Sequence, residues 1–424
     1  MGRRSDYNGA KGVNVGGGQG RPIVHAVETY LREMAEIHIS GAGVSETSYY
    51  PVLAGLLNEL GKSLKPKVRC IIHLRSKGAG IPDGGLFAAD QLRRLREDDD
   101  PLEGQLPARA VLEVKGVGAD VEKTAQSAQV SKYLGQYGLV LVTNYRDFQL
   151  ARAGPGGKVE LLERYTLADT ERAFWALARE PRKAAEAQGD RLAEFLRRVM
   201  LTNAPLTRPE DVAWFLASYA RDARARVAAG DLPALAAIRA TLEETLGLTF
   251  EGEKGDHFFQ STLVQTVFYG IFSAWVLWHG ENPTRKESFD WRTSAYYLRV
   301  PVMQALFEEV ADASKLRSLG LIDLLRWAGA TLNRVDKAAF FAAFEQGHAV
   351  QYFYEPFLEA FDPQLRKDLG VWYTPPEIVQ YMVARVDTAL REELGIADGL
   401  ADTRVVVLDP CCGAPRGAVW QYPN

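Results

Sequence analysis

The sequence predicts a protein of several domains: an α/β domain comes first, an all-α domain follows, and the start of a second α/β domain comes last. Three observations predict this order. Apolar and polar residues alternate in segments between residues 68 and 165, and apolar residues recur at helical spacing from residue 167 to about residue 350. A short apolar strand at residues 404–408 leads into an acidic residue and a glycine turn. With 424 residues, 47% of them hydrophobic, the chain is long enough for about two to four domains.

Charge and cysteine content exclude several classes of protein. The net charge of −4 and the isoelectric point near 6.0 argue against a chain coated in basic residues, so nucleic-acid binding would depend on local patches. The three cysteines, Cys70, Cys411 and Cys412, provide neither a disulfide framework nor a CxxC metal motif. Residues 1–20 are rich in glycine and lack an apolar signal segment, so we expect a disordered leader and a cytoplasmic protein.

One apolar run, from His257 to His279, is long enough to cross a bilayer. It carries no acidic residue, lysine or arginine, but polar residues such as Gln260 and Gln265 interrupt it, and no basic cluster flanks it. We therefore expect a buried core helix.

The first expected domain spans residues 21–165 and begins with two helices. Apolar spacing predicts a helix over 22–36 and a second helix that is capped by Thr47 or Ser48 and closed by Gly61. Strands are expected at 68–74, around Asp83, and at 110–116, 139–143, 147–152 and 159–162, with one helix over 121–137. The charged insertion at 91–109 is expected to be a solvated loop.

Two segments of this domain carry the residues of a candidate active site. Apolar and charged positions alternate in the strand at 110–116, which places Glu113 and Lys115 on one face. If a neighbouring strand delivers Asp83, two carboxylates could hold Mg²⁺ while Lys115 orients or activates a water. These groups suit phosphodiester hydrolysis. Glu46, at the start of the second helix, is a candidate third acid for the metal, although the helix dipole more often explains an acid there.

The helix after this strand supplies a further element, because Gln129 and Tyr133 lie four residues apart on one helix face. Pro82-Asp83, Glu113-Val114-Lys115 and Gln129–Tyr133, in this order and with these elements between them, resemble the PD-(D/E)xK nuclease core and the QxxxY element of a subset of that superfamily. The resemblance implies that Asp83 and Glu113 coordinate Mg²⁺, that Lys115 positions the attacking water, and that Gln129 and Tyr133 support the DNA or the site. A degenerate fold that only binds DNA and a chance grouping of solvated charges remain alternatives.

Residues 166–350 are expected to form an all-α connector. The sequence predicts a helix that ends at Pro181 and further helices over 191–201, 209–229 and 235–246. The tryptophans of this region are better explained by packing between helices than by base stacking. Because His257 and His279 show no ligand spacing, we expect no second active site here.

The last part of the chain, residues 351–424, carries two further motifs. Tyr373-Thr374-Pro375 precedes a helix expected over 377–394, and the strand expected at 404–408 leads into Asp409-Pro410-Cys411-Cys412-Gly413. An apolar strand that ends in an acidic residue and a glycine turn is how a Rossmann-like sheet opens onto a nucleoside. The motifs resemble those of the adenine-N6 DNA methyltransferases. The resemblance implies that S-adenosylmethionine binds at Tyr373, Thr374, Pro375, Asp409, Pro410, Cys412 and Gly413.

A nuclease, a helical coupler and a methylase in one chain resemble the single-chain restriction-modification enzymes of types ISP and IIG, over roughly residues 44–413. The implied fold is a restriction-endonuclease-like α/β domain, a helical connector and a fragment of a Rossmann-like methyltransferase. The implied substrate is double-stranded DNA. Two alternatives stay open: a methylase-class protein with a vestigial nuclease fold, and an inactive interaction fragment of a broken gene.

The sequence departs from the methylase pattern after Gly413. The family has a small residue and a glycine there, and further on an Asn-Pro-Pro-Tyr/Phe element that grips the flipped adenine. Here the chain continues with Ala414-Pro415 and ends at Asn424. We therefore expect a truncated methylase that does not transfer methyl groups by itself. A separately encoded remainder with a target-recognition domain would then be a further partner.

Overall fold

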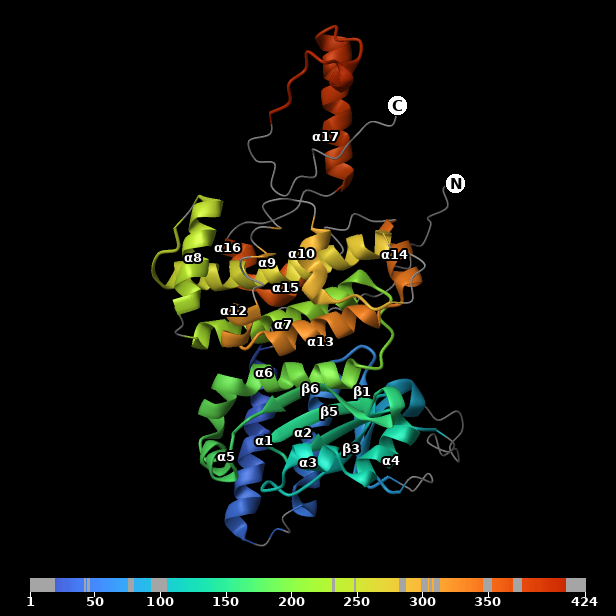
Figure 1. Ribbon diagram of the computed structural model, residues 1–424, viewed down its shortest axis with the longest axis vertical. Coiled ribbons are helices and arrows are strands. Elements are labelled where there is room, and N and C mark those ends of the chain that lie inside the picture. The colour runs from blue at the N-terminus through green and yellow to red at the C-terminus, as the bar shows by residue number, and fades with distance from the viewer. Residues whose placement is uncertain are drawn as a thin grey trace, which may run out of the picture. The chain divides into compact units, whose positions relative to one another are not determined.

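The structure, a computed structural model, describes residues 20–41, 43, 46–74, 80–92, 105–230, 233–247, 249–281, 287–298, 304, 307–308, 313–345, 353–368 and 376–408. It divides the chain into two compact units, Met1–Asp362 and Pro363–Asn424 (Figure 1). The domain boundaries expected near residues 165 and 350 stay predictions.

A mixed sheet forms the centre of the first part of unit one. Its strands follow the order of the sequence: β1 (Val68–Ile72), β2 (Gly84–Ala88), β3 (Ala110–Val114), β4 (Leu139–Thr143), β5 (Asp147–Ala153) and β6 (Val159–Thr166). Only β3 and β4 pair in parallel; the other neighbours are antiparallel. A parallel pair needs a crossover, which α3 (Val121–Ala125) and α4 (Ala128–Tyr137) supply. Because β2 and β3 are antiparallel, the end of β3 lies beside the start of β2 at one edge of the sheet.

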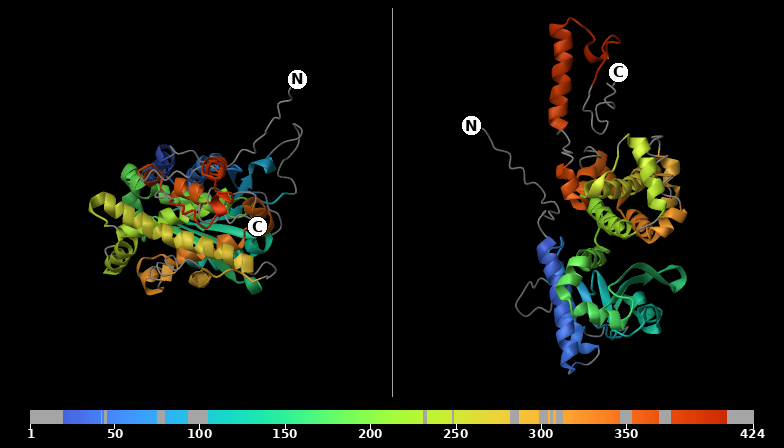
Figure 2. Two further views of the ribbon diagram at one scale, coloured as in Figure 1. Left: turned by 90° about the horizontal axis from the view of Figure 1, so that it is seen from above. Right: turned by 90° about the vertical axis from the view of Figure 1, so that its left-hand side faces the viewer.

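Helices cover both faces of this sheet. One face packs against α1 (Gly20–Ser40), α2 (Tyr50–Lys62) and α6 (Pro181–Leu201), and the other against α3 and α4 (Figure 2). Strand β4 shows why both faces are apolar: Leu139 and Leu141 enter the larger core, while Val140 and Val142 enter the smaller one. Such two-sided burial is typical of a strand in the middle of an α/β sheet.

Several elements of this region differ from expectation. Thr47 and Ser48 do not cap α2; they belong to the 3-10 turn η1 (Thr47–Tyr49), and no side chain caps α2. Gly61 does not close α2 but lies inside it, so close to β1 that an added Cβ would overlap the carbonyl oxygen of Val68. The helix expected over 121–137 is two helices, because the Ser127 hydroxyl accepts from the N–H of Val130 and begins α4. Residues 75–79 and most of the charged insertion at 91–109 lie outside the described residues.

The helical part of unit one begins with α5 (Glu171–Ala178) and α6. It continues with α7 (Pro209–Ala229), α8 (Pro233–Leu246), α9 (Gly252–Glu281), α10 (Ser294–Tyr297), α12 (Ala313–Ser318), α13 (Ile322–Asn333), α14 (Lys337–Glu345) and α15 (Glu355–Phe361). The bounds of α7 agree with expectation. Helix α6 was expected only from residue 191, but it begins at Pro181, because proline suits the first position of a helix as well as it suits an end.

Helix α9 contains the apolar run considered above. By length and composition alone it could cross a membrane, yet 67% of its most apolar window is buried inside the structure. Phe268, Ile271 and Trp275 are among its buried residues, and the helix packs against α7 and α10. The expectation of a buried core helix is confirmed.

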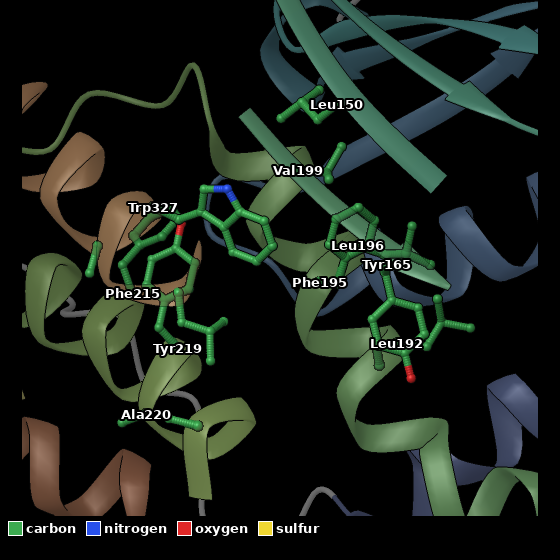
Figure 3. Close-up of a cluster of buried hydrophobic side chains, with 14 of the residues drawn as sticks. Leu150, Tyr165, Leu192, Phe195, Leu196, Val199, Phe215, Tyr219, Ala220 and Trp327 are labelled. Atoms are coloured by element: carbon green, nitrogen blue, oxygen red, sulfur yellow. The ribbon is translucent and has the colours of Figure 1, made fainter. Parts of the chain in front are cut away.

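The hydrophobic core continues from the sheet into the helical part. Leu150 of β5 and Tyr165 of β6 lie next to Phe195 and Leu196 of α6, and the cluster extends to Phe215 of α7 and its neighbours (Figure 3). Helix α6 therefore packs against both the sheet and the helical part of unit one.

A chain of buried polar contacts crosses the same boundary, and we call it the buried junction. Glu163 on β6 accepts from Arg198 Nε on α6 at 2.9 Å and from the Tyr219 hydroxyl on α7 at 2.5 Å. Arg198 Nη1 donates to Ser218 Oγ at 2.7 Å, and the Tyr219 hydroxyl lies 3.2 Å from Thr331 Oγ1 on α13. The junction thus ties one strand to three helices.

The second unit contains α16 (Pro363–Asp368), α17 (Pro376–Thr388) and the π-helical turn η6 (Ala389–Glu393). The last two together correspond to the helix expected over 377–394. The strand expected at 404–408 is not formed, since residues 405–408 have no ladder partner among the described residues, and Val406 is 90% exposed. The described residues of this unit, 363–368 and 376–408, therefore show no Rossmann-like sheet.

Candidate active site

The structure brings Asp83, Glu113 and Lys115 together at one edge of the sheet. Asp83 immediately precedes β2, while Glu113 lies in β3 and Lys115 follows it. Because β2 and β3 are antiparallel, with Gly84 opposite Leu112, the start of one strand lies beside the end of the other. The antiparallel pairing therefore brings together side chains that are about 30 residues apart in sequence.

Asp83 is fixed by four hydrogen bonds. Its main chain donates to the Leu112 carbonyl at 3.1 Å and accepts from the N–H of His73 at 2.8 Å. Its carboxylate accepts from the N–H of Val114 at 2.7 Å and from the Tyr50 hydroxyl at 2.7 Å. The Asp83 carboxylate thus accepts the Val114 N–H just beyond the last residue pair of the β2–β3 ladder, where a backbone carbonyl would otherwise accept it.

Glu113 is the most deeply buried acid of the site, with a side chain that is 2% exposed. Its Oε1 lies 2.7 Å from Lys115 Nζ, and its Oε2 accepts from Gln129 Nε2 at 3.3 Å. Burial raises the pKa of Glu113, and the hydrogen bond and charge of Lys115 oppose this increase only in part. The positive charge of Lys115 therefore compensates only in part for the burial of the Glu113 carboxylate.

Lys115 is surrounded by acids. Its Nζ lies 4.0 Å from Glu46 Oε1 as well as 2.7 Å from Glu113 Oε1. Burial alone would lower the pKa of Lys115, but the neighbouring carboxylates, Glu113 first, raise it overall. A lysine that holds its proton suits orienting a water or stabilising negative charge, and does not suit accepting a proton.

Gln129 and Tyr133, the predicted pair on α4, connect the two halves of the site. Gln129 Nε2 donates to the Tyr133 hydroxyl at 2.9 Å as well as to Glu113. The Tyr133 hydroxyl in turn donates to the Ile81 carbonyl at 2.9 Å, two residues before Asp83. Because Tyr133 is 1% exposed, the geometry suits a positioning role for this side chain.

Two tyrosines that sequence reasoning missed also hold the site. The Tyr50 hydroxyl, which donates to Asp83, lies 3.1 Å from Glu46 Oε1. The Tyr145 hydroxyl donates to the Glu46 carbonyl, and Tyr145 itself has a positive φ of 73°. Tyr50 and Asp83 are 33 residues apart and Tyr145 and Glu46 are 99 apart, so no local spacing could have indicated these contacts.

The donor set allows a test of whether Mg²⁺ fits. No three His, Cys, Asp or Glu side chains lie close enough to hold a metal ion in the part of the chain that the structure describes. However, Mg²⁺ is usually held by one or two carboxylates and completed by waters, so the lack of a three-residue group does not exclude it. Glu46 and Glu113 lie beside the Lys115 ammonium group, and the charge of Asp83 also acts on it. Three carboxylates and one ammonium group leave an excess of negative charge that a divalent cation would offset. The oxygen ligands and the charge of these side chains are compatible with a divalent cation, and Glu46 contacts the site through Tyr50 and Lys115.

The residues expected to bind S-adenosylmethionine, namely Tyr373, Thr374, Pro375, Asp409, Pro410, Cys412 and Gly413, lie outside the described residues.

Comparison with known proteins gives one family match. Residues 345–416 match the model of the N-6 DNA Methylase family. This match relates the C-terminal part of the chain to the DNA adenine methyltransferases, which use S-adenosylmethionine as methyl donor and DNA as substrate. No curated protein and no solved structure matches the chain.

Proposed function

We propose that the chain is part of a bifunctional restriction-modification enzyme, in which unit one cleaves DNA and the C-terminal part contributes to an adenine-N6 methylase. The observation that carries the nuclease proposal is the meeting of Asp83, Glu113 and Lys115, with Lys115 Nζ 2.7 Å from Glu113 Oε1. The family match at residues 345–416 supports the methylase half of the proposal.

Each side chain has a distinct role in the proposed hydrolysis. Asp83 and Glu113 would hold Mg²⁺, which when bound lowers the pKa of a water and offsets charge on the phosphate. Lys115, kept protonated by Glu113, orients the attacking water and stabilises the phosphoryl oxygens. Gln129 holds Glu113 in place, and Tyr133 ties α4 to the segment before Asp83.

The test is cleavage of unmethylated plasmid DNA by the whole chain, with Mg²⁺ and with EDTA. We expect cleavage that requires Mg²⁺. Lys115→Ala should reduce the cleavage rate by about 10²–10⁴-fold, because the ammonium group that stabilises the transition state is lost. Lys62→Ala is the matched control, since Lys62 is exposed and pairs with Glu59 on its own helix. Cleavage by Lys115→Ala at the wild-type rate would contradict the assigned roles.

A second candidate is a methylase-family protein whose sheet domain binds DNA without cutting it. It is supported by the position of the family match, which lies wholly within residues 345–416, and by the lack of a three-ligand metal group in the described residues. DNA binding that is independent of Mg²⁺, with no cleavage under any condition, would favour this alternative.

A further inference from the structure

A separate pocket lies in unit one between the α2–β1 loop and helices α6 and α7. Its volume is about 110 Å³, and none of the candidate active-site residues lines it. Since a water needs about 10–15 Å³ of such space, a ligand of roughly ten non-hydrogen atoms would fit. Its apolar walls include Leu64, Pro66, Leu201, Leu206, Trp214 and Phe215.

Arg197 of α6 brings an unused hydrogen-bond donor to this pocket. Its side chain is 5% exposed. Nη1 donates to Glu194 Oε1 at 3.4 Å and Nη2 donates to Ser63 Oγ at 3.1 Å. The buried Nε has no hydrogen-bond partner in the described structure. Because a buried N–H without a partner is unfavourable, an acceptor on a bound molecule would stabilise this arrangement.

Asp211 of α7 brings an unused acceptor to the same pocket. Within the described ranges its carboxylate has no hydrogen-bond or ion-pair partner, since the neighbouring Arg208 pairs with Glu210 at 3.2 Å. Burial raises the pKa of Asp211 to about 6, and Arg208 offsets this increase only in part. Asp211 is only partly buried, and a ligand N–H group would give its carboxylate a hydrogen bond inside the pocket.

These groups narrow the chemistry of the ligand. Both Nη atoms of Arg197 already donate within the protein, to Glu194 and to Ser63, whereas its Nε has no partner in the described structure. A single acceptor atom of a ligand would therefore add a hydrogen bond at Nε without displacing an existing one, whereas a carboxylate bound by the fork of the guanidinium would compete with an existing bond. A purely apolar ligand would satisfy neither Arg197 nor Asp211. Trp214 and Phe215, in edge-to-face contact at 5.1 Å, offer aromatic surface to a flat ring.

We propose that this pocket binds an adenine-type base, with its amine donating to Asp211, a ring nitrogen accepting from Arg197 Nε, and its ring against Trp214. An amine beside a ring nitrogen supplies the donor and the acceptor that these two side chains lack. The volume of the pocket is large enough for a two-ring base of about ten non-hydrogen atoms.

The experiment is a calorimetric titration of the whole chain with adenosine, and with cytidine and phenylalanine as comparison ligands. We expect saturable binding of adenosine alone, weakened at least about tenfold by Asp211→Leu, which removes the acceptor, and by Trp214→Leu. Asp323→Leu on α13 is the matched control, because that carboxylate is exposed and pairs with Arg326 at 3.1 Å. Absence of adenosine binding, or equal binding of cytidine or phenylalanine, would overturn the proposal.

Adenosine could also bind at the S-adenosylmethionine motif, so a further variant separates the two sites. Asp409→Ala should leave the affinity of the pocket unchanged. Binding that survives Asp211→Leu but is lost in Asp409→Ala would place the ligand in the methylase segment and refute the proposal. Circular dichroism of each variant checks that the fold is intact.

Discussion

Arg198 on α6 donates to Glu163 on β6 at 2.9 Å, and both side chains are almost completely buried, at 1% and 5% exposed. The remaining oxygen of Glu163 accepts from Tyr219 on α7. A buried ion pair is favourable only when further hydrogen bonds satisfy both partners, which is the case here. Buried hydrogen bonds as well as apolar packing therefore join the sheet to the helical part.

Breaking the buried junction at one partner should be strongly destabilising. Arg198→Ala leaves the Glu163 carboxylate buried without its cation, and we expect the free energy of unfolding to fall by about 3–5 kcal/mol in urea denaturation. Arg182→Ala on the same helix is the control, because its pair with Glu186 is largely exposed; we expect a change below about 0.5 kcal/mol. Equal losses in the two variants would show that the junction contributes little.

Replacing both partners tests the origin of that loss. The double variant Glu163→Leu, Arg198→Met removes both charges together and leaves no unpaired carboxylate. We expect it to be more stable than Arg198→Ala alone by the same denaturation measurement. A double variant less stable than the single one would contradict the assignment of the loss to an unpaired charge.

Two glycines of α2 should respond in opposite directions to alanine. The Cβ added by Gly61→Ala would overlap the carbonyl oxygen of Val68 on β1, so we expect a loss of about 1–3 kcal/mol or more. Gly55, on the exposed side of the same helix, has nothing within 4 Å of an added Cβ. Gly55→Ala should therefore gain about 0.5–1 kcal/mol from helix propensity. Thermal unfolding of the two variants measures the contrast, and a stable Gly61→Ala protein would mean that α2 and β1 are less closely packed.

Tyr50 should matter for cleavage more than its neighbour does. Tyr50→Phe removes the hydroxyl that donates to Asp83 Oδ1 at 2.7 Å, and we expect the cleavage rate at saturating Mg²⁺ to fall about tenfold through loss of positioning. Tyr49→Phe is the control: Tyr49 is equally buried, and no hydrogen bond of its hydroxyl is found in the described structure. A slow Tyr49→Phe enzyme beside a normal Tyr50→Phe enzyme would refute the role of Tyr50.

Asp211 should make stability depend on pH. Burial raises its pKa to about 6, above the usual aspartate value of 3.8, so the folded protein binds the proton more tightly than the unfolded chain does. The resulting contribution to stability is present below about pH 4 and is lost as the pH rises through about 6. Asparagine does not titrate. We therefore expect Asp211→Asn to be more stable than wild type by about 1–2 kcal/mol at pH 7, after discounting for partial exposure, with the difference vanishing near pH 4. A difference that is constant with pH would contradict this interpretation.

Sequence periodicity predicted most helices because their apolar stripes are long and regular, as in α7. Sequence periodicity failed where one type of residue occurs in more than one structural position. Pro181 was interpreted as a helix end but begins α6, and Ser127 begins a helix within a segment expected to be continuous. Strand β6 runs four residues beyond its expected end, to Thr166, because its buried Glu163 finds partners on α6 and α7 that no local pattern reveals.

The residues of the candidate site likewise include some that the sequence indicates and some that it does not. Asp83, Glu113 and Lys115 were recognisable because they sit in short motifs whose order has a physical meaning. Tyr50 and Tyr145 were not, because their roles depend on contacts between segments far apart in the chain. The adenine-type pocket was also invisible in the sequence, since an unpaired Arg197 Nε is defined only by packing.

The buried junction also limits how evolution or an experimenter can divide this gene. A crossover or a truncation placed just after β6, at the apparent end of the α/β region, would leave Glu163 and Tyr165 facing water on a sheet that has lost α6. An exchangeable module would need to carry α6 with the sheet and to meet a compatible α7 surface on the other side. Exchanging the sheet region between related chains should therefore succeed only when Ser218 and Tyr219 are exchanged with it or are already present in the recipient.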